Sequence, residues 1–162
     1  RKLRKEIMNA LKQKNEISFD VNASAMKVRD GMDMALIEID PTSKLIRYAG
    51  ANNSLYHISE EMFNEIKADK MPLSIHAKMN NFTTKEIEYK KGDVFYMFSD
   101  GYADQFGGPK GKKFKYKPFK ELLLNYHHRN MKEQKLILEK TFNDWKKDYD
   151  QIDDVLIVGI KI

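Results

Sequence analysis

Residues 92–101 have the sequence GDVFYMFSDG, and this stretch decides the fold class. Its opening Gly-Asp pair favours a tight turn. Residues 94–98 (VFYMF) are then continuously apolar, which predicts a short strand that is buried on both faces. Such a strand requires a sheet with another layer packed on each side. The strand ends at Ser99, so that Asp100 and Gly101 stand directly after a buried element.

Further strands are expected on both sides of this stretch. Alternating or apolar segments separated by turn residues predict them at residues 33–40, 45–50, 54–58, 82–89 and 155–162. The spacing in residues 60–67 allows either a short helix or a strand, and the surrounding strands favour a strand. Strands that follow one another along the chain imply antiparallel pairing.

Apolar residues at helical spacing predict three helices, at residues 1–14, 118–128 and 131–147. The polar residues 15–29 favour a loop, and the Gly- and Lys-rich residues 107–118 favour a second, flexible loop. The order of one helix, several strands, two helices and a last strand predicts the α+β class, with helices layered on sheet.

The composition limits the function classes. The 162 residues suit one domain, and the net charge of +5 comes from 29 basic and 24 acidic residues that are mixed along the chain. We therefore expect no nucleic-acid contact. Cysteine is absent, which excludes disulfides and thiolate metal sites and fits a reducing, cytoplasmic location. No apolar run reaches the roughly 18 residues of a membrane helix, so this segment is expected to make no membrane contact, although a longer parent can still be anchored.

Carboxylates stand beside two of the predicted buried strands. Asp100 follows residues 94–98, and Asp153 and Asp154 directly precede residues 155–162. If the two strands are neighbours, the carboxylates converge, and a cation between them would relieve their repulsion. Oxygen ligands without cysteine suit Mg²⁺ or Mn²⁺. A strand-end turn, a helix cap and a pair of acid and base groups fit the same residues, and these alternatives stay open.

Other candidate sites are weaker. No two of the four histidines stand at metal-ligand spacing, which does not favour a zinc site and leaves them structural or surface roles. Residues 107–113 (GGPKGKK) lack the Walker pattern of nucleotide-binding loops. A basic loop beside an acidic site could nevertheless attract a phosphorylated protein by charge.

Four segments, taken in order, resemble sporulation-protein-E-type serine phosphatases of the metal-dependent protein phosphatase superfamily. They are residues 30–36 (DGMDMAL), 48–53 (YAGANN), 92–104 (GDVFYMFSDGYAD) and 151–155 (QIDDV). Each segment is a weak signal alone, whereas the ordered set is specific and extends over the whole chain.

The resemblance implies an α-β-β-α sandwich with two Mn²⁺ or Mg²⁺ ions at one end. These ions activate a water for attack on a phosphoserine or phosphothreonine, so no side chain is the expected nucleophile. By this resemblance Asp100 and Asp153 ligate one metal, and Asp154 lies beside it as an alternative ligand. Gly101 and Asp104 are expected to support the site, and Asp104 would orient either the turn or a metal-bound water. The implied substrate is a phosphorylated anti-anti-sigma-factor-like protein in a partner-switching pathway that regulates a sigma factor, and the residues that bind it stay unknown.

The chain departs from the family pattern at two points. The first metal motif, Gly-Asp followed by Ser-Gly-His-Gly, is absent and would lie upstream of residue 1. Residues 1–162 are therefore expected to be the C-terminal portion of a single phosphatase domain, with an incomplete sandwich, no activity alone and an exposed sheet edge suited to a homodimer. Leu156 replaces the Thr of many relatives, which a position at the start of a buried strand should tolerate.

Two other functions remain open. The absent first motif would also suit a non-catalytic signalling or protein-interaction domain that keeps the phosphatase fold. A nucleic-acid binder has only the positive charge in its favour.

Overall fold

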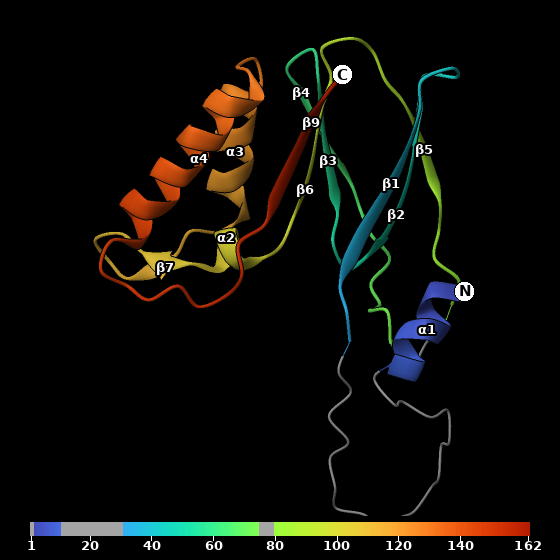
Figure 1. Cartoon of the computed structure of the whole chain (residues 1–162). Coiled ribbons are helices and arrows are strands. Elements are labelled where there is room, and N and C mark those ends of the chain that lie inside the picture. The colour runs from blue at the N-terminus through green and yellow to red at the C-terminus, as the bar shows by residue number, and fades with distance from the viewer. Residues whose placement is uncertain (1, 11–30, 75–79) are drawn as a thin grey trace, which may run out of the picture.

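The computed structural model describes residues 2–10, 31–74 and 80–162. In chain order its elements are α1 (Lys2–Ala10), β1 (Met34–Asp40), β2 (Leu45–Ala51), β3 (Leu55–Ser59), β4 (Met62–Ile66), β5 (Lys85–Glu88), β6 (Val94–Phe98), α2 (Gly101–Asp104), β7 (Phe106–Gly107), β8 (Lys112–Lys113), α3 (Tyr116–Tyr126), α4 (Met131–Lys146) and β9 (Ile157–Lys161) (Figure 1).

The strands form two main sheets and one small hairpin. One sheet has the order β1-β2-β5, the second has the order β4-β3-β6-β9, and β7 pairs with β8. Every pairing between these strands is antiparallel, as their sequential order predicts. Strand β6 lies between β3 and β9, and four of its five residues are buried, which confirms the prediction for residues 94–98.

The two main sheets pack face to face. Their shared core contains Ile46 and Tyr48 from β2, Leu55 from β3 and Phe95 from β6, all at most 1% exposed. The short turn between β2 and β3 carries the chain from one sheet to the other. This arrangement supplies the two β layers of the expected sandwich.

Helices α3 and α4 cover the other face of the four-stranded sheet, on one side of the molecule (Figure 1). Their core joins apolar side chains of the sheet and helices: Tyr56, Ile58, Val94, Tyr96, Phe98, Tyr102, Phe119, Leu123 and Phe142. The Tyr96 hydroxyl also donates a hydrogen bond to Gln134 Oε1 over 2.7 Å, so β6 and α4 are joined by a buried polar contact. The predicted layering of helices on sheet is confirmed.

Residues 107–118 differ from the predicted flexible loop. They contain β8 and the first turn of α3, and Gly107 belongs to β7. A Cβ on Gly107 or Gly108 would collide with Trp145, so the glycines allow the hairpin to lie directly on α4. The glycines here permit a close approach between two elements. The local sequence pattern does not distinguish such glycines from those of a flexible loop.

Strand β9 is less buried than predicted for residues 155–162. Leu156, just before the strand, is 61% exposed, and Val158 is 38% exposed. The reason is its position, because β9 is the last strand in the order of its sheet and, among the described strands, pairs only with β6. Leu156 therefore does not begin a buried strand. Its exposure, and not burial, has to explain why Leu is tolerated in place of Thr at this position.

The remaining predictions concern element type and boundaries. The ambiguous residues 60–67 contain β4, so the strand interpretation was correct. Helix α1 ends at Ala10, while residues 11–14 and the predicted loop 15–29 lie outside the described residues. None of the helices in the described part of the chain combines the length and apolar character that crossing a membrane requires.

Candidate functional site

The end of β6 and the beginning of β9 meet where the strands of the four-stranded sheet end. This end of the sheet, with Asp100, Asp153 and Asp154, is called the carboxylate edge below. The two strands are antiparallel neighbours, and Phe98 pairs with Ile157 in their register. Asp100 follows β6 by two residues, and Asp153 and Asp154 shortly precede β9, so the register brings these segments to the same edge (Figure 1). The structure thus places the two acidic segments side by side and meets the condition, neighbouring strands, on which the sequence-based expectation for Asp100 and Asp153 depends.

Ser99 fastens these two segments together. Its hydroxyl donates a hydrogen bond to the Asp154 carbonyl over 2.7 Å and accepts one from the Leu156 amide over 2.9 Å. Its own amide donates to the Leu156 carbonyl over 2.9 Å. The local sequence does not indicate this role of Ser99, because its partners are 55 and 57 residues away in the chain.

Gly101 allows the same close approach. A Cβ at this position would collide with the Asp154 carbonyl oxygen and would lie 3.0 Å from the carbonyl carbon. A side chain would therefore push the Asp100 segment away from the Asp154 segment. This contact gives Gly101 a specific positioning role at the edge.

The three predicted carboxylates are open to solvent. Asp100, Asp153 and Asp154 are exposed, and none forms an ion pair with a Lys or Arg of the described residues. Asp100 occupies the N-cap position of α2, but its side chain makes no capping hydrogen bond. The helix-cap alternative therefore does not use this carboxylate.

Negative charge gathers around this edge. Burial raises the pKa of the Tyr116 hydroxyl, and the charges of Asp100 and Asp104 raise it further. Asp104 itself is engaged, because its carboxylate pairs with Lys113 Nζ at 2.9 Å and its amide donates to the Asp100 carbonyl at 2.9 Å. Asp104 thus ties the turn to the β7-β8 hairpin, and its supporting role at a metal stays a prediction.

The donor chemistry of the edge fits a hard divalent cation in part. Exposed carboxylates on two adjoining segments are the oxygen ligands that Mg²⁺ and Mn²⁺ prefer. The described residues contain no group of three or more His, Cys, Asp or Glu side chains that could hold a metal ion. Asp100, Asp153 and Asp154 therefore remain a predicted, partial set of ligands.

Asp93 is a buried acid at the end of β6 opposite to Asp100, and its contacts are structural. Asp93 lies 2.9 Å from His57 Nε2, both side chains are buried, and the His57 ring stacks on Phe95 at 4.3 Å. Burial would raise the pKa of Asp93, but hydrogen bonds from Ser59, the Lys90 amide and His57 outweigh it and hold that pKa below its usual value. This cluster agrees with a structural role for His57.

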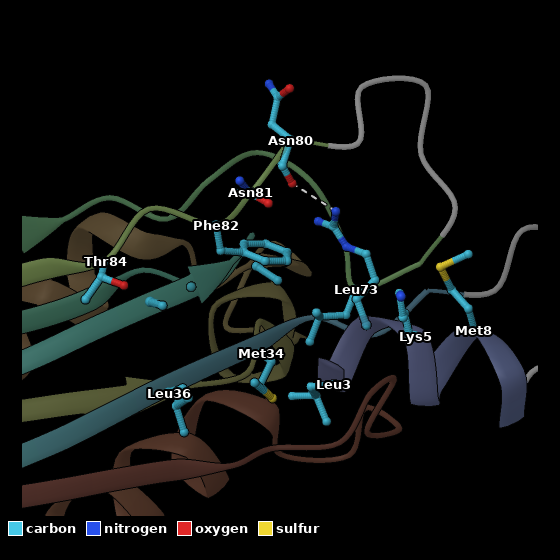
Figure 2. A pocket seen from close by; sticks show the side chains of 14 residues that line it. Leu3, Lys5, Met8, Met34, Leu36, Leu73, Asn80, Asn81, Phe82 and Thr84 are labelled. Carbon is cyan, nitrogen blue, oxygen red and sulfur yellow. Dashed lines mark hydrogen bonds between the residues drawn. The ribbon is translucent and has the colours of Figure 1, made fainter. Parts of the chain in front are cut away.

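A separate cavity of about 600 Å³ lies between α1 and the three-stranded sheet. Figure 2 shows Leu3 and Met8 of α1 and Met34 and Leu36 of β1 among its lining side chains. Arg4 also lines it; its guanidinium donates to the Asn80 carbonyl at 2.9 Å and stacks on the Phe82 ring at 4.5 Å. The sequence did not reveal this cavity, because its walls come from segments about 70 residues apart.

Comparison with known proteins identifies the fold. The family profile for stage II sporulation protein E (SpoIIE) matches residues 3–162. The SiaA PP2C domain of Pseudomonas aeruginosa matches with 25% identity and a TM-score of 0.73, over 80% of this chain and 51% of that one. The phosphatase domain of Bacillus subtilis SpoIIE has 15% identity and a TM-score of 0.61, over 98% of this chain and 64% of that one.

The fold likeness extends to the wider phosphatase superfamily. The PPM Ser-Thr phosphatase MsPP of Mycobacterium smegmatis, solved with cacodylate, has 10% identity and a TM-score of 0.58, over 98% of this chain and 69% of that one. A search of curated proteins found no match. The chain spans about half the length of the SiaA domain. On this evidence the chain belongs to the SpoIIE family and has the fold of PPM phosphatase domains.

Proposed function

We propose that this chain contributes part of the metal site of a protein serine/threonine phosphatase. Its substrate would be a phosphorylated anti-anti-sigma-factor-like protein in a pathway that regulates a sigma factor. Membership of the SpoIIE family supports the phosphatase activity. The sigma-factor pathway is supported by the family resemblance alone. In this proposal the chain is cytoplasmic and is not sufficient for activity by itself.

The carrying observation is the contact between the Ser99 hydroxyl and the segment of Asp154 and Leu156. It joins the ends of two neighbouring strands, beside exposed carboxylates that form no ion pair with a Lys or Arg of the described residues. A divalent cation between carboxylates on two adjoining segments would relieve their repulsion.

Asp100, Asp153 and Asp154 are the residues that would hold the cation. A bound Mn²⁺ or Mg²⁺ would supply positive charge to a phosphoryl group and lower the pKa of a water. Among the similar structures, a SpoIIE phosphatase domain was presoaked with manganese and RsbX was solved in complex with magnesium. The protein's own part in the chemistry is positional, because Ser99 and Gly101 keep the two ligand-bearing segments in contact.

The test measures metal binding and phosphate release separately. Mn²⁺ affinity is measured by calorimetry on the 162-residue chain, and phosphate release from a phosphoserine peptide is measured on the chain and on the full-length protein in which it occurs. We expect Asp100→Asn and Asp153→Asn each to weaken Mn²⁺ binding by at least about tenfold. We also expect both variants to abolish phosphate release by the full-length protein.

Asp148→Asn is the matched control, because Asp148 is exposed, lies in the loop before β9 and forms no ion pair among the described residues. It should leave both measurements unchanged. A folded, Mn²⁺-supplied full-length protein that releases no phosphate would contradict the proposal and favour the non-catalytic interaction domain.

A further inference from the structure

The β7-β8 hairpin and its continuation into α3 carry a concentrated positive charge. Residues 106–117, called the lysine hairpin below, contain five lysines and no acidic residue. The five are exposed: Lys110, Lys112, Lys113, Lys115 and Lys117. Of these, Lys113 alone forms an ion pair within the described part of the chain, with Asp104. Four cationic side chains are thus open to a partner.

This hairpin is held in a fixed position. The Gly108 amide donates to the Trp145 carbonyl over 2.9 Å, and the Phe114 ring packs edge-on against Trp145 at 5.4 Å. A Cβ on Gly108 would lie 2.6 Å from the Trp145 ring, so the hairpin backbone presses directly on the indole. Because these contacts fix the backbone, the lysines are presented from a rigid support, and ordering them costs a partner less entropy.

The lysine hairpin is also bonded to the carboxylate edge. The Lys115 amide donates to the Ala103 carbonyl over 2.7 Å, and the Phe114 amide donates to the Gln105 carbonyl over 2.9 Å. The Lys113–Asp104 ion pair adds a side-chain link, and the Asp104 amide donates to the carbonyl of Asp100. Two short contacts therefore separate the basic surface from the candidate metal ligand, and Figure 1 shows β7 beside α2.

A positively charged surface that adjoins a negatively charged one selects a particular partner. Exposed charges act over about 8 Å at physiological salt, so the unpaired Asp100, Asp153 and Asp154 would repel an acidic protein segment that crossed them. The lysine hairpin attracts the same segment to the neighbouring surface. A phosphoserine carries about −1.5 to −2 charges, and acidic residues beside it would extend the attraction to the lysines.

We propose that the lysine hairpin is a docking surface for an acidic segment that flanks the phosphoserine of a protein substrate. The inference rests on the proposed phosphatase function for its substrate. The surface acts through long-range attraction, so it raises the association rate and confers salt dependence. The acidic flank stays over the lysines, and the phosphate would reach the carboxylate edge only where the divalent cation of the proposed function offsets the charge of Asp100, Asp153 and Asp154.

The test uses two labelled phosphoserine peptides, one with Glu and Asp on one side of the phosphoserine and one with Ser and Gly in their place. Fluorescence anisotropy measures their binding to the 162-residue chain in Mn²⁺. The Lys110→Glu/Lys112→Glu variant reverses two charges that have no partner in the described structure. We expect it to weaken binding of the acidic peptide by about tenfold or more and to flatten the salt dependence.

The matched control is the Lys91→Glu/Lys132→Glu variant, which makes the same change in net charge. Lys91 precedes β6, at the end opposite to Asp100, and Lys132 lies on α4; both are exposed and form no ion pair among the described residues. This variant should bind the acidic peptide like the unchanged chain. Circular dichroism of both variants verifies that each is folded.

Three results would overturn the docking surface. They are equal affinity for the two peptides, an equal loss in the two double variants, and equally tight binding of RNA or phosphatidylserine vesicles, which would indicate attraction of any polyanion. Phosphate release by the full-length protein distinguishes this inference from the proposed function. Lysine-dependent binding without phosphate release would refute the phosphatase and leave the lysine hairpin as a surface that binds acidic phosphopeptides. Phosphate release without lysine dependence would refute the docking surface and keep the phosphatase.

Discussion

Two small residues position the candidate site. Ser99 supplies one hydroxyl that both donates to the Asp154 carbonyl and accepts from the Leu156 amide. Gly101 supplies the absence of a side chain, because the Asp154 carbonyl occupies the space that a Cβ would need. The carboxylates of the edge are therefore placed by neighbours that cannot themselves bind a cation strongly. Substitutions at these neighbours should act on the metal through geometry.

Gly101→Ala tests this directly. The added methyl group must displace the Asp154 carbonyl, so we expect the free energy of unfolding to fall by about 1–3 kcal/mol. We also expect weaker Mn²⁺ binding, because the two acidic segments separate.

Gly92→Ala is the matched control: no atom lies within 4 Å of its added Cβ, but its φ of +96° disfavours a side chain. It should cost stability, of order 1–3 kcal/mol, without affecting Mn²⁺ affinity. Urea unfolding and calorimetry measure the two quantities, and equal Mn²⁺ affinity in both variants would refute the steric role.

At the scale of elements, a buried polar cluster fastens the β5–β6 turn to the core. The Asp93 carboxylate accepts from the Lys90 amide at 3.0 Å and meets His57 of β3 at 2.9 Å. The Asp93 backbone carbonyl accepts from the Ile162 amide at 3.0 Å, so the end of the chain is attached at the same point. The ionised carboxylate therefore joins the β5–β6 turn to β3, and the Asp93 backbone attaches the end of the chain beside it.

This cluster predicts a loss of stability in acid. The pKa of Asp93 is 3.8 in the unfolded reference and lower in the folded protein. Its contribution is therefore fully present above pH 3.8 and is lost as the pH falls through the lower folded value. We expect Asp93→Asn to lower the free energy of unfolding by about 1.5–3 kcal/mol at neutral pH and to reduce the slope of stability against pH below about pH 4. Urea titrations across this range, with Asp148→Asn as the control, measure both effects. A variant with an unchanged slope would show that another group causes the acid sensitivity.

At the scale of the whole molecule, the sequence predicted what depends on local pattern. The apolar run at residues 94–98, short and bounded by turn residues, was enough to predict a strand that is buried on both faces. The same kind of run in residues 155–162 gave a wrong prediction of burial. Burial of β9 depends on how many strands flank it, and the sequence of the strand does not contain that information. The association of Asp100 with the Asp154 segment was expected on the condition that the two strands are neighbours, and the strand order of the structure meets that condition. The Ser99 contact and the cavity beside α1 did not, because both arise only when distant segments meet.

The exposed edge of β9 predicts an association between molecules. Within the described residues β9 pairs only with β6, so its other edge presents backbone groups without a strand partner, beside the exposed Val158. Strand edges of this kind pair with other chains, and a lysine on the edge opposes such pairing. We propose that the 162-residue chain self-associates through β9, and we expect Val158→Lys to shift it toward the monomer in sedimentation experiments at several concentrations.

Leu136→Lys is the matched control for this association. Leu136 is 65% exposed on α4, so the substitution makes the same change in charge and removes a similar apolar side chain away from any sheet edge. It should leave the association unchanged, because pairing between strand edges depends on the backbone hydrogen bonds of β9, and Leu136 lies on α4. If both variants dissociate the chain equally, general apolar contact rather than strand pairing holds the molecules together. A chain that is monomeric at every concentration would show that the β9 edge is not an interface between copies.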